Sequence, residues 1–300
     1  SFNSADMVAR ALHGPDFDPH NPHRVASATF WSVYQGVRQG NVYLDANTVF
    51  SDAKRLTGVE DVKVLAQAVK SMRDNNRLVI EKTDNGNAIY HPSYHRMECE
   101  VAEHLISRSR RDVSDETYTS DYIRGFSRYG LTEDQVEAVR KGLTKPVSIT
   151  TGLPGTGKTT ILRTLCKILT QEKQSILLVA PTGIASKRAS DITGLEAQTI
   201  HRAFGAGAPD ESKESASEYA GVIKDESDYV ELAPNDPTKE FWKANPHTPL
   251  SPSVVIVDEA SMVDLHLLWR MLEGISYSTR IIFVGDVEQL PPVGVGFTLK

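Results

Sequence analysis

The sequence predicts an α/β protein, in which a domain built on a parallel sheet follows a smaller, mostly helical domain. A length of 300 residues suits about two domains. From residue 131 onward, short β-branched runs alternate with helical stretches. The runs lie at 147–151, 175–180, 254–257 and 280–284. Continuous apolar runs separated by helices are typical of strands buried on both faces of a parallel sheet.

The composition is that of an ordinary globular protein. Hydrophobic residues make up 40% and charged residues 24%, which excludes collagen-like, disordered and membrane classes. Neither a signal peptide at the start nor an apolar run near the roughly 18 residues of a membrane span is present. Cys99 and Cys166 provide neither a disulfide framework nor a metal cluster, so we expect a reducing, cytoplasmic compartment.

The net charge of −6 argues against a nucleic-acid partner if only the sum is considered. Its location changes that argument. Residues 206–252 contain ten acidic and four basic residues, so this segment carries the whole imbalance. The same segment holds six of the fifteen prolines. We therefore interpret it as an insertion rather than a core element.

A helix and a hairpin are predicted in the N-terminal part. In residues 61–74 the apolar positions recur at spacings of three and four, which indicates one helical face. Two β-prone runs, 78–80 and 88–90, flank the turn-forming residues 84–87. Helices followed by a hairpin give a winged-helix-like order. Such a domain either serves packing or reads a DNA groove, and the sequence leaves both open.

The expected organisation has four segments. They are a loose start at 1–23, the winged-helix-like domain at 24–111, a linker at 112–130 and the sheet domain at 131–300. The basic run at 108–111 is expected to be a solvated part of the linker rather than a binding patch.

The strongest motif is the segment 152–159, which matches G-x-x-x-x-G-K-[ST] between a predicted strand and a predicted helix. Its glycines allow the backbone to wrap a phosphate chain with the N–H groups pointing inward. The following helix adds the positive end of its dipole. Lys158 can reach the β- and γ-phosphates, and the Thr159 hydroxyl can bind Mg²⁺. The sequence thus predicts a P-loop NTPase that uses a nucleoside triphosphate and Mg²⁺, and the resemblance described below implies that the nucleotide is ATP.

Two further strands end in polar residues. The run 254–257 delivers Asp258 and Glu259 to the carboxyl edge of the sheet, where ligands bind in open α/β sheets. Asp258 is expected to hold Mg²⁺, and Glu259 to orient and deprotonate the attacking water. After the strand at 280–284, Gln289 offers both a donor and an acceptor and suits sensing of the γ-phosphate or of that water.

In this order, the P-loop, Asp-Glu-Ala-Ser-Met and Gly-Asp-x-x-Gln-Leu-Pro-Pro resemble motifs I, II and III of superfamily 1 helicases, and most closely the RecD-like, 5′→3′ branch. Residues 130–135 resemble the Q motif, 180–185 resemble motif Ia, and 199–202 resemble the Thr-Ile-His element. The resemblance covers about residues 130–296. It implies a RecA-like fold for the sheet domain.

The resemblance implies a set of site residues. The nucleotide-binding residues are Gln135, which reads the adenine edge, and Gly152, Leu153, Pro154, Gly155, Thr156, Gly157, Lys158, Thr159 and Thr160. The metal is held by Thr159 and Asp258, and the catalytic residues are Lys158, Glu259 and Gln289. The DNA-binding residues are Pro181, Thr182, Gly183, His201 and Arg202.

The resemblance to this family implies a role for the insertion. Residues 206–252 occupy the position of the 1B subdomain, which carries a pin that splits duplex DNA. Phe241 and Trp242 are the aromatic candidates for the pin, since bases stack on aromatic faces. The alternative, that they only anchor the insertion to the motor, stays open.

The implied partners are single-stranded DNA and duplex junctions, with protein partners at the N-terminal domain, no membrane, and a setting in DNA repair or recombination. Superfamily 1 motors also need a second RecA-like domain, 2A, with motifs IV to VI. Because the 300 residues hold no such motifs, we expect an N-terminal region plus a first motor domain that hydrolyses ATP poorly without the second.

Three alternatives remain. One is an RNA helicase of the Upf1-like branch, although Met262 after Asp-Glu-Ala-Ser favours the RecD-like branch. Another is a nucleotide-switched DNA-binding ATPase that does not unwind. A third is a P-loop ATPase or kinase for which DNA is irrelevant, a reading that motifs Ia and III disfavour.

Overall fold

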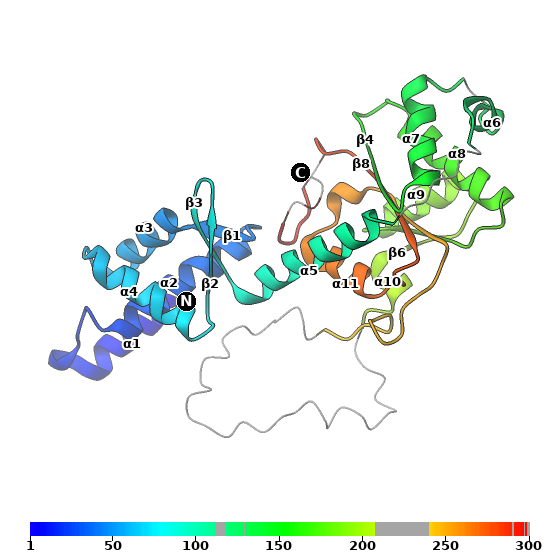
Figure 1. Cartoon of the computed structure of the whole chain (residues 1–300). Helices are drawn as coiled ribbons and strands as arrows, with labels where there is room; N and C mark the ends of the chain where they lie inside the picture. The colour runs from blue at the N-terminus through cyan, green and yellow to red at the C-terminus, as the bar shows by residue number, and fades with distance from the viewer. Residues whose placement is uncertain (112–117, 129, 208–239, 290, 297, 299–300) are drawn as a thin grey trace, which may run out of the picture. The chain divides into compact units, whose positions relative to one another are not determined.

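The computed structural model describes residues 1–111, 118–128, 130–207, 240–289, 291–296 and 298. Contacts divide the chain into two compact units (Figure 1). The N-terminal unit comprises Ser1–Glu100 with residues 292–296, and the sheet unit comprises Val101–Pro291 with Thr298. The division falls inside helix α5 (Pro92–Ser109), ahead of the linker expected at 112–130.

The N-terminal unit combines helices with a three-stranded sheet. Its elements are α1 (Phe2–His13), η1 (Gly14–Asp16), α2 (Pro22–Arg38), β1 (Tyr43–Asp45), α3 (Ala46–Thr57), α4 (Val62–Asp74), β2 (Val79–Thr83) and β3 (Gly86–Tyr90). The antiparallel sheet has the order β1-β3-β2. From α2 onward the order of elements is helix, strand, two helices and a hairpin. This is the winged-helix order that the sequence suggested.

The predicted hairpin is confirmed, with Val79 opposite Tyr90 and Thr83 opposite Gly86. The predicted helix at 61–74 is confirmed as α4, which Asp61 caps by accepting a hydrogen bond from the backbone N–H of Lys63. Leu65, Ala68, Val69 and Met72 are its buried residues. The apolar face of α4 therefore forms part of the core of this unit.

The first 23 residues are more ordered than their composition suggested. Residues 2–13 form α1, and Phe2 at its start is buried. Asp6 accepts hydrogen bonds from both Arg24 and Arg10, and Arg24 also donates to the carbonyl oxygens of Pro19 and Thr57. The expectation of a loose start is corrected, because the guanidinium group of Arg24, only 9% exposed, ties this segment to α2 and α3.

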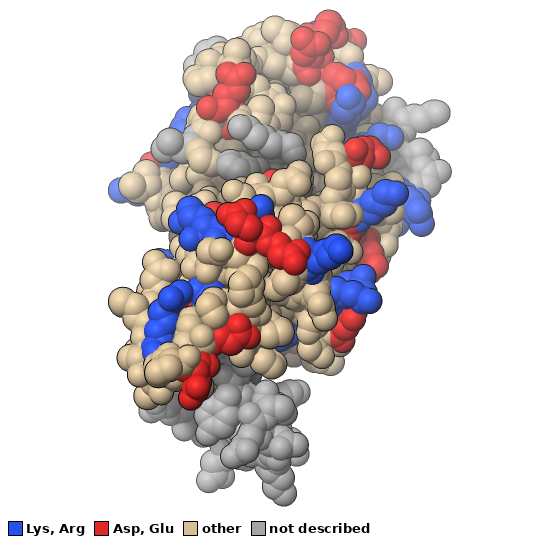
Figure 2. Space-filling view, turned by 90° about the vertical axis from the view of Figure 1, so that its left-hand side faces the viewer, with Lys and Arg blue, Asp and Glu red and all other residues tan. Residues whose placement is uncertain are grey.

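Charged side chains of both signs are mixed on the surface. On the face shown in Figure 2, Lys and Arg side chains alternate with Asp and Glu side chains in small groups and do not form one basic patch. Among the described residues, no helix combines the length and apolar character that crossing a bilayer requires.

The sheet unit is an α/β fold. Its elements are α6 (Ser120–Gly125), α7 (Glu133–Thr144), β4 (Val147–Thr151), α8 (Lys158–Gln171), β5 (Ile176–Ala180), α9 (Gly183–Thr193), β6 (Ala197–Thr199), α10 (Ile200–Phe204), β7 (Val254–Val257), η4 (Ala260–Met262), α11 (Leu265–Glu273) and β8 (Arg280–Gly285). The sheet is parallel throughout, with the order β4-β8-β7-β5-β6. The α/β fold class is confirmed, and β6 is an edge strand that the sequence did not predict.

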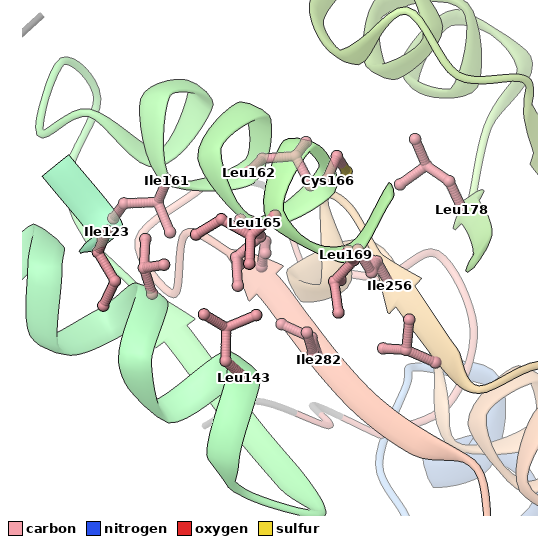
Figure 3. Close-up of a cluster of buried hydrophobic side chains, with 14 of the residues drawn as sticks. Ile123, Leu143, Ile161, Leu162, Leu165, Cys166, Leu169, Leu178, Ile256 and Ile282 are labelled. Carbon is pink, nitrogen blue, oxygen red and sulfur yellow. The ribbon is translucent and has the colours of Figure 1, made fainter. Parts of the chain in front are cut away.

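The core of the sheet unit lies between α7, α8 and the sheet. Figure 3 shows the buried side chains of α8 gathered against Leu143 of α7, Ile256 of β7 and Ile282 of β8. All four residues of β7 are buried, as are five of the six residues of β8. Even Gly142 is constrained, since a Cβ atom there would lie 2.8 Å from a methyl carbon of Leu165.

Arg108 contradicts the expected solvated run at 108–111. It is fully buried and donates to the carbonyl oxygens of Ile275 and Ser276, at 3.2 Å each. Its guanidinium carbon lies 4.7 Å from the ring centroid of Tyr277. Arg111 donates to the carbonyl oxygen of Tyr277 at 2.8 Å. The end of α5 is thereby anchored to the loop that precedes β8.

We expect Leu165→Ala to lower the free energy of unfolding by about 2–5 kcal/mol, because the side chain is fully buried and its removal leaves a cavity between α7 and the sheet. Urea unfolding followed by circular dichroism measures the change. The control is Ile184→Ala, whose side chain is 86% exposed and whose effect is expected within about 0.5 kcal/mol. Equal effects of the two variants contradict this description of the core.

Candidate functional site

Three neighbouring strands bring the three strongest motifs together. β4, β8 and β7 are adjacent in the sheet and parallel, so their carboxyl ends meet at one edge. The P-loop follows β4, Asp286 and Gln289 follow β8, and Asp258 and Glu259 follow β7. This is the edge at which open α/β sheets bind ligands.

The P-loop has the backbone that its glycines permit. Gly155 and Gly157 have φ angles of 82° and 93°, and Gly157 is the N-cap of α8. At Gly152, a Cβ atom would lie 2.5 Å from the Thr156 hydroxyl oxygen. A side chain at these positions would therefore strain or block the loop. The free N–H groups at the start of α8 are suited to an anion.

Lys158 connects the P-loop to the end of β8. Its ammonium group donates to the carbonyl oxygen of Gly152, to that of Leu153 at 3.1 Å, and to Oδ2 of Asp286 at 3.1 Å. The side chain is 17% exposed. The cation that the sequence assigned to phosphate binding is therefore positioned by oxygen atoms of two motifs.

Asp286 is a site residue that the sequence reasoning missed. Its carboxyl group is 1% exposed. Burial alone would raise the pKa of Asp286, but hydrogen bonds from Lys158 and the backbone N–H of Glu288, the charge of Lys158 and a hydrogen bond from Gln289 hold it below its ordinary value. A polar residue directly after a buried strand was the available signal, the same one that identified Asp258.

Asp258 and Glu259 form a partly buried acidic pair. Burial raises the pKa of Asp258 to about 6, and the charge of Glu259 adds to that shift. A hydrogen bond from the backbone N–H of Glu259 and the charges of Arg188 and Lys158 oppose it. Glu259 has a φ angle of 51° and a ψ angle of 41°, a left-handed conformation that is strained for a residue with a side chain. Arg188 on α9 donates to Oε1 of Glu259 at 3.0 Å.

These residues line one pocket of about 330 Å³. Its lining is Pro154, Gly155, Gly157, Lys158, Thr159, Leu162, Arg188, Ile192, Asp258, Glu259, Gly285 and Gln289. Thr159 and Asp258 both line it, and hard oxygen donors such as a hydroxyl and a carboxylate suit Mg²⁺. The raised pKa of Asp258 indicates a carboxylate that a nearby cation would stabilise. The residues present therefore fit a Mg²⁺ ion.

Gln135 lies against the P-loop. Its side-chain Nε2 donates to the carbonyl oxygen of Thr156 at 3.0 Å, and its Oε1 accepts from the backbone N–H of Thr132 at 3.1 Å. Together with the Thr132 hydroxyl it forms a capping box at the start of α7. The side-chain amide thus links α7 to the P-loop. To hydrogen-bond the adenine edge of a nucleotide, Gln135 would have to make that contact in addition to these two hydrogen bonds or in their place.

A second pocket of about 350 Å³ adjoins the first, since Ile192 lines both. Thr160, Arg163, Thr164 and Lys167 of α8 line it together with Phe126, Ser127, Arg128, Ile192, Thr193 and Gly194. Lys167 and Arg163 donate to the carbonyl oxygens of Phe126 and Ile192, at 3.2 and 2.9 Å. The sequence reasoning did not identify this pocket, because its residues share no local motif.

The candidate DNA-binding residues follow the two strands on the other side of β7. Pro181, Thr182 and Gly183 follow β5, and Thr182 caps α9 by accepting from the backbone N–H of Ala185 at 3.2 Å. His201 and Arg202 follow β6 on the short helix α10 and are exposed. The sheet edge thus carries the P-loop and the acidic pair on one side and the DNA candidates on the other.

The described ends of the insertion lie together. Ala206 and Trp242 form an antiparallel bridge, and the backbone N–H of Ala244 donates to the carbonyl oxygen of Phe204 at 3.0 Å. Trp242 is 3% exposed, with its ring centroid 5.5 Å from that of His201. Its burial supports the anchoring alternative over a pin, whereas Phe241 is 45% exposed. Residues 208–239 of the insertion lie outside the described residues.

Comparison with known proteins agrees with this arrangement. The family described as "AAA domain" matches residues 135–295, more than half of the chain and all three motifs. The chain belongs to this family. Its AAA domain contains the P-loop, the acidic pair and Gln289 within one matched segment.

Relatives of the AAA domain include RecD-like helicases. The ATP-dependent RecD2 DNA helicase of Deinococcus radiodurans is 26% identical over 99% of this chain and 38% of its own length. The RecBCD enzyme subunit RecD of Haemophilus influenzae is 33% identical over 56% of this chain and 26% of its own length. The predicted RecD-like resemblance is confirmed, and the chain spans less than two-fifths of either relative.

A solved structure of Bacteroides Pif1 bound to ssDNA is 26% identical and covers 55% of this chain and 34% of that chain. The TM-score is 0.30, too low to define a shared fold.

We expect Asp258→Asn to raise the free energy of unfolding at pH 7.5 by roughly 1–3 kcal/mol when measured in EDTA. The folded-state pKa of about 6 exceeds the unfolded value, so the buried charge costs stability above pH 6. That cost disappears as the pH falls below about 4, and the two proteins then converge. Urea unfolding across this pH range measures the difference. Asp191→Asn, an exposed carboxylate on α9, is the control, and a less stable Asp258→Asn protein at pH 7.5 contradicts the pKa shift.

Proposed function

We propose that this chain is the ATP-hydrolysing region of a RecD-like DNA helicase, which couples ATP turnover to movement along single-stranded DNA. The observation that carries this proposal is the convergence of Lys158, Glu259 and Gln289, from three separate motifs, on one pocket beside the P-loop. The names of the relatives support the same class, since both are DNA helicases or a subunit of one.

Phosphate binding is assigned to the P-loop and Lys158. The backbone N–H groups of the loop and the start of α8 surround the phosphate chain. The ammonium group of Lys158 exchanges its contact with Asp286 for the β- and γ-phosphate oxygens. Recognition of the adenine edge is assigned to Gln135, whose side chain lies against the P-loop.

Hydrolysis is assigned to the residues that follow β7 and β8. Thr159 and Asp258 would hold Mg²⁺, which would supply charge neutralisation at the β- and γ-phosphates. Glu259 accepts a proton from the attacking water, and Gln289 orients that water through its amide. Asp286 holds the amide of Gln289 in place through a 3.2 Å hydrogen bond from Nε2 to its own Oδ2.

The polarity and the substrate are part of the proposal. Single-stranded DNA runs along the edge formed by Pro181, Thr182, Gly183, His201 and Arg202. Movement is in the 5′→3′ direction, and the supporting observation is the resemblance of motifs II and III to the RecD-like branch. Unwinding of duplexes with a 5′ or a 3′ single-stranded tail tests the direction, and preference for the 3′ tail contradicts it.

Two substitutions separate binding from chemistry. We expect Lys158→Ala to weaken ATP binding about ten- to a hundredfold, because charged hydrogen bonds to the phosphates are lost. Glu259→Gln is expected to leave ATP binding largely intact and to lower kcat about 10²- to 10⁴-fold, because the amide cannot accept the proton. Fluorescent-nucleotide binding and phosphate release measure the two effects.

The matched control for these variants is Lys141→Ala, an exposed cation on α7. It is expected to change neither nucleotide binding nor turnover. An equal loss of ATP affinity in Lys158→Ala and Glu259→Gln contradicts the roles assigned to the two residues.

Arg202→Ala is expected to weaken single-stranded DNA binding and to reduce the slope of log K against log salt by about 0.7, the value for one phosphate contact to a single strand. Fluorescence anisotropy with labelled oligo(dT) at several salt concentrations measures the slope. Lys141→Ala is again the control, and an unchanged slope for Arg202→Ala excludes a phosphate contact.

A further inference from the structure

Helices α3 and α4 of the N-terminal unit form a helix-turn-helix. α3 ends at Thr57, and a turn of four residues, with Gly58 in the left-handed conformation, leads into α4 at Val62. A turn of this length that contains glycine is typical of the motif. Both helices pack against α2, and Val59 of the turn is buried in the same apolar cluster as Leu65 of α4 (Figure 1). A shared core therefore holds the two helices together.

The strands complete a winged-helix topology around this motif. β1 lies between α2 and α3 in the sequence, the hairpin of β2 and β3 follows α4, and the sheet order is β1-β3-β2. β1 pairs with β3, so the hairpin is joined to the same small domain as the two helices. In a helix-turn-helix, the second helix is the one that enters the major groove of duplex DNA. α4 holds that position here.

The outward face of α4 carries two lysines. The buried residues of α4 lie on one side of the helix, and Lys63, Gln67 and Lys70, at spacings of four and three, lie on the opposite side. All three of these side chains are exposed. Gln67 offers both a donor and an acceptor, the groups that hydrogen-bond the edge of a base. This face thus combines cations with one side chain that can read a groove.

The cations of α4 and the hairpin are not neutralised by the protein itself. Within residues 1–100, several exposed guanidinium groups are ion-paired with carboxylates, namely those of Arg10, Arg55, Arg73 and Arg96. The exposed Lys and Arg side chains that form no ion pair with any described residue are Arg38, Lys63, Lys70 and Lys82. The last three lie on α4 and on β2 of the hairpin. A phosphate backbone attracts cations in this state.

Acidic side chains close to this face are already engaged, with one exception. Asp61 caps α4, and Asp74 and Glu60 form ion pairs with a neighbouring Arg and Lys side chain, at 2.8 and 3.1 Å. Asp84, in the turn of the hairpin, is exposed and forms no ion pair with a described residue. Its charge opposes that of the nearby lysine on β2, which provides a substitution of opposite sign for the test.

We propose that the N-terminal unit binds duplex DNA, with α4 in the major groove and the hairpin beside it. Lys63 and Lys70 contact phosphates that border the groove, and Lys82 contacts the backbone next to the hairpin. Because cations outnumber the groups that can read bases, binding depends only weakly on sequence. This site is separate from the single-stranded DNA edge of the sheet unit and does not depend on the ATPase assignment.

The first test measures binding of a short blunt-ended DNA duplex to the whole chain, without nucleotide, by fluorescence anisotropy at several salt concentrations. The combined Lys63→Ala and Lys70→Ala variant is expected to reduce the slope of log K against log salt by about 1.8, since each phosphate contact contributes about 0.9. The same slope corresponds to about 60-fold weaker binding at about 0.1 M salt. Unchanged duplex binding assigns these lysines to another partner, such as an acidic protein surface, and overturns the proposal.

The matched control is Arg38→Ala, which removes an exposed cation that also lacks an ion pair but lies at the end of α2. Its slope is expected to equal that of the unmodified protein, whereas Lys82→Ala is expected to reduce the slope by about 0.9. Equal effects of Arg38→Ala and Lys82→Ala reflect net charge alone and overturn the proposal. The combined variant is also expected to keep its affinity for oligo(dT), and a parallel loss of oligo(dT) binding contradicts a separate site.

The second test uses the opposing charge in the hairpin. Asp84→Asn is expected to tighten duplex binding about two- to fivefold, because an exposed carboxylate near the phosphates costs up to about 1 kcal/mol. Unchanged or weaker binding shows that the hairpin does not lie beside the duplex and overturns that part of the proposal.

The third test replaces the DNA duplex by an RNA duplex of the same sequence. The major groove of A-form RNA is too deep and narrow to be read, so α4 cannot enter it. Duplex RNA is therefore expected to bind more weakly by at least one phosphate contact, about eightfold at about 0.1 M salt. Equal affinity for both duplexes, lost equally in the combined lysine variant, overturns the placement of α4 in the major groove.

Discussion

The burial of β7 and β8 at the centre of the parallel sheet is the constraint on which the sheet unit depends. Four of four residues in β7 and five of six in β8 are buried, with α7 and α8 packed over them. Buried strand positions disfavour polar side chains, so polar groups concentrate where the strands end. Because parallel strands end at the same edge, the carboxylates after β7 and β8 lie beside the P-loop after β4.

Placing polar residues at the ends of these buried strands lowers the stability of the fold. Asp258 is buried enough to raise its pKa, Glu259 has strained dihedral angles and an unpartnered oxygen atom, and Asp286 depends on Lys158 for its charge. Each arrangement costs folding free energy that an apolar residue would not. The packed core supplies the stability that allows these groups to persist, and in the proposed function their charges face a nucleotide and its metal ion.

The sequence predicted four of the five strands of the parallel sheet because each is a short run of β-branched or apolar residues between helical stretches. The fifth, β6, and β1 of the N-terminal sheet have three residues each and no such pattern. Motif spacing predicted the pocket lining around Lys158, Asp258 and Glu259. It could not predict the contacts of Asp286 and Arg188, since each contact joins residues that are 71 or more positions apart in the chain. Likewise, the burial of Trp242 follows from the bridge to Ala206 and not from the local sequence.

The contacts of Arg108 define where the sheet unit begins along the chain. The linker expected from composition begins at residue 112, and an expression fragment started there would lack the guanidinium group that satisfies the carbonyl oxygens of Ile275 and Ser276. The face of Tyr277 on which that group lies would become exposed as well. A fragment that starts at Val101 retains these contacts, so the sheet unit begins within α5, about a dozen residues before the first residue of the expected linker.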